Sequence, residues 1–281
     1  MRYASFLAVL LVVAALPVAT RAAESYDNCT GTIAALPATI STQGVWCLKQ
    51  DLGTAMTSGA AITIATNNVT IDCNDFKLGG LAAGDGSQTR GIQALNRHNI
   101  TVRHCNVRGF LIGIDLGGDA GGGHLVEDNR LDHNLRGGIL VRGSHNRVLR
   151  NAIHATGGSP DSIATWGIRA TGDIIDNLVA DVFATGANGQ AEGIEFSGDG
   201  SQVRDNHVRG LDPNGTGQAF GIHGLGEGVA IDGNRVAQEV ATTGTGISGG
   251  PDNVFCTYNT VLHYSTPLAL CDAALGNLTL P

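Results

Sequence analysis

The sequence contains few lysines, few aromatic residues and an excess of acidic groups. Lys49 and Lys77 are its only lysines, Phe, Trp and Tyr together make up 5% of the residues, and the formal net charge is −8. An acidic chain is a poor binder of nucleic acid, so no nucleic-acid partner is expected. Beyond residue 22 there is no apolar run of about 18 residues, and no membrane partner is expected either.

Common catalytic and metal-binding signatures are missing as well. The sequence has no phosphate loop, no Gly-x-Ser-x-Gly and no His-Glu-x-x-His. Its cysteines do not follow the Cys-x-x-Cys spacing of structural zinc sites. These absences exclude the best-known nucleotide-binding, serine-hydrolase and zinc-protease patterns, and no cofactor is assigned with certainty.

The first 22 residues have the pattern of a secretory signal peptide. Arg2 precedes an apolar stretch over residues 5–19, and small residues follow, with cleavage expected after Ala22. The stretch is too short for a membrane span. We therefore expect a secreted or periplasmic protein.

Six cysteines follow in the rest of the chain, and an even number in an exported protein indicates disulfide bonds. Six cysteines allow several connectivities. The preferred one pairs nearest neighbours: Cys29 with Cys47, Cys73 with Cys105, and Cys256 with Cys271.

Two markers repeat along the chain. The first is an Asn that follows an apolar-x-apolar run, and it occurs at Asn74, Asn129, Asn151, Asn177, Asn206, Asn234 and Asn259, with Cys105 at the equivalent place in one repeat. The second is Gly-Ile, which begins at Gly91, Gly113, Gly138, Gly167, Gly193, Gly221 and Gly246. Its spacings are 22, 25, 29, 26, 28 and 25 residues. Internal repeats of this length predict a solenoid.

Short β-branched segments separated by Gly and Asn indicate coils of strands rather than helices. One coil cannot bury its own apolar face, so coils stack and their strands pair in parallel at about 4.8 Å. With its Asn ladder and Gly-Ile strands, the chain resembles the pectate-lyase-like superfamily of right-handed parallel β-helices. The resemblance implies an all-β, single-stranded solenoid, and it covers lyases, hydrolases, epimerases, adhesins and uncharacterised proteins.

The predicted organisation is a signal peptide over residues 1–22, an N-terminal cap over 23–59, the β-helix over 60–262 and a C-terminal cap over 263–281. The Gly-Ile markers and a similar segment at residues 61–64 predict about eight coils. Disulfides in both end segments fit a capping role. We expect a monomer.

The residue after each Gly-Ile is expected on the outer face, because Ile points inward. That column consists of Gln93, Asp115, Leu140, Arg169, Glu195, His223 and Ser248. Arg169, Glu195 and His223 fall in consecutive coils and are the candidate catalytic residues. A solvated ladder of opposite charges is the alternative interpretation.

Long connections precede three of these strands. Between the ladder position and the next Gly-Ile there are 15, 15 and 14 residues before Gly167, Gly193 and Gly221, against 7 and 8 before Gly113 and Gly138. Long loops on a rigid scaffold are where binding sites form. Trp166 and Phe220, which lie in these connections, are candidate substrate-binding residues together with Asp115 and Gln93. For Trp166 the alternative is an aromatic ring packed on the coil.

A further column is acidic and includes Asp173, Asp199 and Glu227. Calcium would neutralise such a row, because it takes oxygen ligands. The preferred interpretation is that Asp favours Gly-rich turns, and calcium is a weaker alternative.

The hypothesis for function is binding of a polysaccharide, with lyase-type cleavage as the preferred chemistry. In that chemistry Arg169 neutralises a sugar carboxylate and His223 removes a proton, with Glu195 as orienting group or acid. A hydrolase needs two carboxyl groups about 5–9.5 Å apart, and Glu195 and Asp115 are expected about 14 Å apart. Glu195 with Asp173 or Asp199 stays open as a pair, because the sequence does not determine the turn geometry, and hydrolysis ranks below elimination. The paired-Asp motifs of polygalacturonases and the Asp-Pro-His-Asp motif of alginate epimerases do not occur. A non-catalytic carbohydrate-binding or structural surface protein is the competing class.

Overall fold

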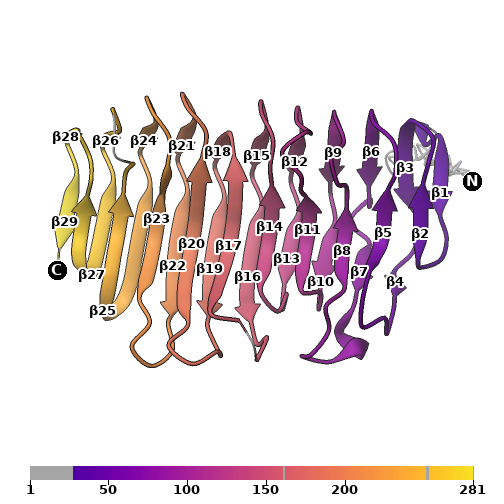
Figure 1. Cartoon of the computed structure of the whole chain (residues 1–281), viewed down its shortest axis with the longest axis horizontal. Coiled ribbons are helices and arrows are strands. Elements are labelled where there is room, and N and C mark those ends of the chain that lie inside the picture. Colours follow the sequence, from indigo (N-terminus) through magenta and orange to yellow (C-terminus); the bar gives the residue numbers. More distant parts are fainter. Residues whose placement is uncertain (1–27, 161, 251–252, 281) are drawn as a thin grey trace, which may run out of the picture.

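The computed structural model describes residues 28–160, 162–250 and 253–280, so the expected signal peptide lies outside the described residues. Strands wind along a rod, with the N-terminal and C-terminal turns at opposite ends (Figure 1). The short 3-10 segment η2 (Leu81–Ala83) is a minor helical element, and no helix among the described residues is long and apolar enough to span a membrane.

The strands form three parallel sheets, called here sheets I, II and III. Sheet I consists of β1 (Gly31–Ile33), β3 (Gly44–Leu48), β6 (Val69–Asp72), β9 (Ile100–Arg103), β12 (Leu125–Glu127), β15 (Arg147–Leu149), β18 (Asp173–Ile175), β21 (Gln202–Arg204), β24 (Ala230–Asp232), β26 (Phe255–Thr257) and β28 (Ala273–Leu275).

Sheet II contains the Gly-Ile strands. Its members are β2 (Ala38–Ile40), β5 (Ala60–Ile64), β8 (Arg90–Gln93), β11 (Ile112–Leu116), β14 (Gly137–Val141), β17 (Ala164–Thr171), β20 (Gln190–Ser197), β23 (Ala219–Leu225) and the second parts of β25 (Arg235–Ser248) and β27 (Thr260–Ala269).

Sheet III consists of β4 (Leu52–Gly53), β7 (Lys77–Gly79), β10 (Asn106–Arg108), β13 (Arg130–Asp132), β16 (Ala152–Gly157), β19 (Leu178–Phe183), β22 (His207–Asp212), the first parts of β25 and β27, and β29 (Leu278–Leu280). Because β25 and β27 each belong to both sheets, sheets II and III are joined into one 18-stranded sheet. The predicted parallel β-helix is confirmed, with about nine turns instead of eight.

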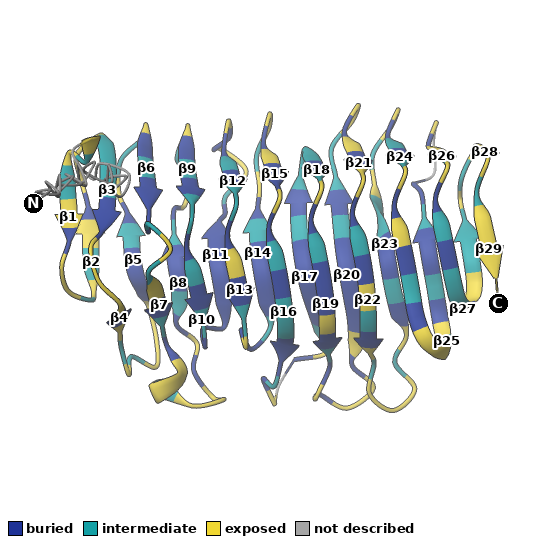
Figure 2. Ribbon diagram, turned by 180° about the vertical axis from the view of Figure 1, so that it is seen from behind, coloured by how far each residue is buried: buried dark blue, intermediate teal, exposed yellow. Residues whose placement is uncertain are grey.

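Alternating burial along each strand builds the core. In sheet III one inward residue per turn stacks on the next, and each of them is fully buried: Leu78, Val107, Leu131, Ile153, Val179, Val208, Val236 and Val261. Burying such side chains stabilises the fold by about 1.5–3 kcal/mol each. Buried residues follow the interior along the rod, whereas β29 at its C-terminal end is exposed throughout (Figure 2).

The asparagine marker forms a hydrogen-bonded ladder in the turn from sheet I to sheet III. The backbone N–H of Asn151 donates to Oδ1 of Asn177 over 2.9 Å, and the same contact recurs from turn to turn. The ladder contains Asn129, Asn151, Asn177, Asn206, Asn234, Asn259 and Asn277. Asn74 lies outside it and donates to the backbone of Leu48 instead. Buried amides that are satisfied in this way fix the turn.

All six cysteines form the nearest-neighbour disulfides that the sequence predicts: Cys29–Cys47, Cys73–Cys105 and Cys256–Cys271. Such bonds are typical of proteins outside the reducing cytosol. The Cys73–Cys105 bond replaces the ladder in the turns before Asn129, where the N–H of Cys105 donates to Oδ1 of Asn129.

The end segments, expected as caps, continue the sheets. At the N-terminal side β1 pairs with β3 and β2 with β5, and at the C-terminal side β28 pairs with β26 and β29 with β27. Asn277 accepts hydrogen bonds from Asn259 and so extends the asparagine ladder into the last described turn. This turn lies beyond residue 262, where the β-helix was expected to end.

The long connections differ from the expected loops. Much of their length extends the strands: β16, β19 and β22 have six residues each, where β7, β10 and β13 have three. The loops that remain cover residues 158–160 and 162–163, 184–189 and 213–218, and they lie along one edge of the rod (Figure 1). This widened part of the rod carries the strands β17, β20 and β23.

Candidate functional site

The expected column of outward residues is present on sheet II. Cα pairing places Arg169 of β17 beside Glu195 of β20, and Glu195 beside His223 of β23. Neighbouring strands in a sheet lie about 4.8 Å apart, so the three residues occupy successive turns as predicted. Their side chains are between a fifth and a third exposed.

A second outward column exists because each Gly-Ile pair interrupts the alternation of the strand. A Cβ on Gly193 would lie 2.3 Å from Cγ1 of Val208 in the core, so this glycine and Ile194 both face inward. The side chain of the residue before the glycine therefore points to the outer face, like that of the residue after the isoleucine. The second column contains Trp166, Glu192 and Phe220, which pair in register.

Glu192 lies in one of the long connections, and sequence reasoning assigned it no role in the site. Strict alternation places it inside, whereas the structure places its carboxylate against Arg169 and His223. The signal that reveals it is the Gly-Ile pair itself: glycine and isoleucine both face inward, so both flanking positions belong to the site. Glu192 and Glu195 of β20 then lie on the same face, with Ala191 and Ile194 in the core.

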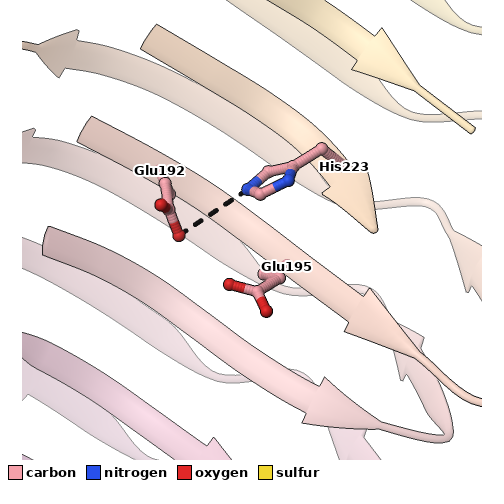
Figure 3. Close-up of side chains that lie close together, drawn as sticks. All are labelled: Glu192, Glu195 and His223. Atoms are coloured by element: carbon pink, nitrogen blue, oxygen red, sulfur yellow. Dashed lines mark ion pairs between the residues drawn. The ribbon is translucent and has the colours of Figure 1, made fainter. Parts of the chain in front are cut away.

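Glu192 stands at the centre of the cluster. Nη2 of Arg169 lies 2.9 Å from its Oε2, and Nε2 of His223 lies 3.6 Å from the same oxygen (Figure 3). Nε of Arg169 also pairs with Oε2 of Glu195. One ligand atom from each of Glu192, Glu195 and His223 falls within 4.8 Å of the others. We call Arg169, Glu192, Glu195 and His223 the sheet II cluster.

The two carboxyl groups have opposite pKa shifts. Burial alone raises the pKa of Glu192, but the neighbouring His223 and Arg169 outweigh it and leave this pKa below its usual range. Burial is the main cause that raises the pKa of Glu195, and the negative charge of Glu192 adds to it, while Arg169 acts in the opposite direction. Glu192 is thus the fixed anion, and Glu195 retains a proton to higher pH than a free glutamate does.

This pattern is suited to acid–base chemistry. Pairs of titratable groups whose surroundings separate their pKa values typically divide into an acid and an anion. Glu192, with a side chain 5% exposed, lies 3.6 Å from Nε2 of His223, within ion-pair distance. Glu195 has a side chain 32% exposed and faces outward.

The composition of the cluster is also that of a metal site, because carboxylates and imidazole ligate divalent ions. The guanidinium of Arg169, however, is ion-paired to both carboxylates. A metal ion would compete with that charge for the same oxygens. The residues present therefore favour acid–base chemistry over metal binding.

Trp166 is buried rather than open to a ligand. It is 3% exposed and packs with Leu111, Ile112 and Leu135 on the outside of sheet II. Cζ of Arg169 lies 4.1 Å from the centroid of its ring, a cation–π contact. The structure therefore agrees with the alternative of an aromatic ring packed on the coil, and the tryptophan supports Arg169.

The other candidate residues fall into two places. Phe220 lies beside the cluster, with its ring centroid 5.0 Å from that of His223. Gln93 and Asp115 lie elsewhere: Nε2 of Gln93 donates to Oδ2 of Asp115 over 3.0 Å, and Asp115 is 4% exposed. Asp115 is three turns from Glu195 by the strand register, as expected.

Two of the three acidic residues considered as calcium ligands, Asp173 and Asp199, accept hydrogen bonds from the backbone of the next turn. Oδ1 of Asp173 accepts a hydrogen bond from the N–H of Gln202, and Oδ1 of Asp199 accepts one from the N–H of Glu227. Donor and acceptor lie 29 and 28 residues apart in the sequence, so each bond joins two neighbouring turns of the solenoid. Calcium binding by Asp173, Asp199 and Glu227 stays a prediction.

Comparisons with known proteins give distant matches. No family model and no curated protein matches the chain. The A-module of the mannuronan C-5 epimerase AlgE6 from Azotobacter vinelandii is similar in structure, with a TM-score of 0.40 and 12% identity over 89% of this chain and 88% of that one. The Dettilon tailspike protein is similar with a TM-score of 0.49 and 18% identity over 88% of this chain and 53% of the tailspike, about half its length.

Both TM-scores lie below 0.5 and both identities below 25%, so neither match carries an argument about function. The described chain is a parallel β-helix with three disulfides and a charged cluster on the outer face of sheet II.

Proposed function

We propose that this exported protein binds a polysaccharide along the outer face of sheet II and cleaves it by lyase-type elimination at Glu195 and His223. The observation that supports the proposal is the cluster itself: an imidazole paired with a carboxylate, an acid with a raised pKa and an arginine lie on consecutive turns. Sugar rings along an extended chain suit such a linear array of side chains, and Phe220 offers an aromatic ring at its edge.

In the proposed reaction His223 acts as the base, through the ring nitrogen not directed at Glu192. It takes the proton from the ring carbon next to a sugar carboxylate. The electron pair forms a carbon–carbon double bond, and the bond between the ring and the glycosidic oxygen breaks. Glu195 gives its proton to the departing oxygen, and solvent then restores both groups. Arg169 supplies the nearest positive charge, which favours the carbanion-like transition state.

Hydrolysis is a weaker proposal. Glu192 lies close enough to Glu195 to provide a second carboxyl group. Its side chain, however, is 5% exposed and is paired with Arg169 and His223. A nucleophile or a base for water must reach the sugar, and this carboxylate is covered.

The test is an activity screen of the oxidised protein on pectic, alginate and neutral glycans, following both ultraviolet absorbance from unsaturated ends and new reducing ends. We expect both signals on an acidic glycan. Glu195→Gln and His223→Gln should each lower kcat by about 100-fold or more. Glu239→Gln, which removes an exposed acid from the end of sheet III, is the matched control and should leave the rate unchanged.

Reducing ends without unsaturated product would replace elimination by hydrolysis. Binding without either product would support the alternative of a non-catalytic carbohydrate-binding protein. Activity that survives both Gln substitutions would place the reaction elsewhere on the molecule.

A further inference from the structure

Two arginines, Arg136 and Arg169, lie over the ring of Trp166, and Arg90 follows on the same sheet three strands from Trp166. The three arginines differ in their partners. Arg90 lies 3.3 Å from Oδ2 of Asp115, and Arg169 pairs with Glu192 and Glu195. Arg136, in the turn before β14, makes no ion pair with a carboxylate among the described residues. It is the uncompensated cation of this group.

The surroundings of Arg136 penalise that isolated charge. Its side chain is half-buried, and Cζ lies 5.1 Å from the centroid of the Trp166 ring. Burial lowers the pKa of Arg136, and the charges of Arg169 and Arg90 lower it further, while Glu192 acts in the opposite direction. A half-buried cation beside like charges is stabilised by an anion.

One hydrogen-bond donor of Arg136 lacks an acceptor. Its Nε is buried and finds no hydrogen-bond partner among the described residues. Trp166 itself is 3% exposed, and Leu111, Ile112 and Leu135 surround it. Buried donors without acceptors are rare in native proteins and are costly. A carboxylate offers two acceptor oxygens, and a guanidinium binds it with two parallel hydrogen bonds.

We propose that Arg136, beside Trp166, forms a subsite for the carboxylate of a uronic acid residue. The inference deepens the proposed function and rests on it, because the subsite would hold the same glycan chain. Gly137, next to Arg136, pairs with Trp166, and Trp166 pairs with Glu192. The subsite is thus about two strand spacings, or about 10 Å, from the strand that carries Glu195. It recognises the charge of a neighbouring sugar and not of the sugar that reacts.

The test measures binding apart from cleavage. In a Glu195→Gln background, short oligogalacturonates and alginate oligomers are titrated by calorimetry at two salt concentrations, alongside their methyl-esterified forms. We expect the free acids to bind at least about tenfold more tightly than the esters. Arg136→Gln should abolish this difference and reduce the salt dependence. Arg142→Gln removes an exposed arginine just after the other end of β14 and should change neither.

Several outcomes would overturn the subsite. Equal affinity for acids and esters in the parent protein would exclude carboxylate recognition, and this comparison needs no Arg136 variant. Full affinity in Arg136→Gln, or binding of sulfated oligomers but not carboxylated ones, would also contradict it. If the protein shows no cleavage but its acid-specific binding depends on Arg136, the subsite stands and only the proposed reaction fails.

Discussion

At the scale of single residues, the main question is how two glutamates on one strand take different roles. Glu192 and Glu195 differ in exposure and in neighbours: Glu192 is covered and contacts both Arg169 and His223, whereas Glu195 faces outward. Burial raises the pKa of Glu195, and the negative charge of Glu192 raises it further. Glu192 is therefore a positioning residue that acts on its two neighbours.

Replacing Glu192 by Gln tests this role. The substitution removes a negative charge beside Glu195, so the pKa of Glu195 should fall. As a proton donor Glu195 must be protonated, and activity is lost as the pH rises through its pKa. We expect the alkaline limb of the kcat/KM profile to move to lower pH in Glu192→Gln, with a reduced maximum. Glu239→Gln should keep the parent profile. A limb that does not move would show that Glu192 has no electrostatic effect on the acid.

The residues of the site also show how far prediction from sequence can go. Arg169, Glu195 and His223 were predicted together because position in a repeat determines the turn and the face. Glu192 was not, because alternation fails at the inward glycine. The sequence also could not predict that Arg136 lacks an ion pair. Whether an ion pair forms depends on where the ends of the long side chains lie, which the strand register does not determine.

At the scale of elements, the Gly-Ile pair determines the shape of sheet II. Each such glycine packs under the next turn, and the Cβ of Gly193 would lie 2.5 Å from the carbonyl oxygen of Gly221 as well as against Val208. The fold was predictable from this marker because the same steric requirement recurs in every turn. The lengthened strands β16, β17, β19, β20, β22 and β23 were not, because nothing in the composition of those segments separates strand from loop.

Gly193→Ala is the corresponding prediction for one element. The added methyl group has no space in the core, so the free energy of unfolding should fall by about 2–3 kcal/mol. Chemical denaturation followed by circular dichroism measures the change. Gly86→Ala is the control, since a Cβ there meets no atom within 4 Å. Equal stability of the two variants would mean that the turns shift apart easily and that the glycine is not required by packing.

At the scale of the whole molecule, each turn of the solenoid contacts its neighbours and little else. Stability in such a protein is a sum over turns and their interfaces. Interior turns are covered on both sides, whereas the last described strands, β28 and β29, are exposed at all positions. The Cys256–Cys271 bond ties the chain just before β28 to the preceding turn. Local unfolding should therefore begin beyond this bond.

Hydrogen–deuterium exchange along the chain tests this arrangement. We expect the fastest exchange among the strands in β28 and β29, and the slowest in β14, β17 and β20, where both neighbouring turns are complete. In Gly193→Ala, exchange should accelerate in β17, β20 and β23, which contact the altered turn, and should stay unchanged in β5 and β8. Equal acceleration from β5 to β27 would instead show that the rod unfolds as one cooperative unit. In that case the ladder and the disulfides couple distant turns more strongly than contacts between neighbours imply.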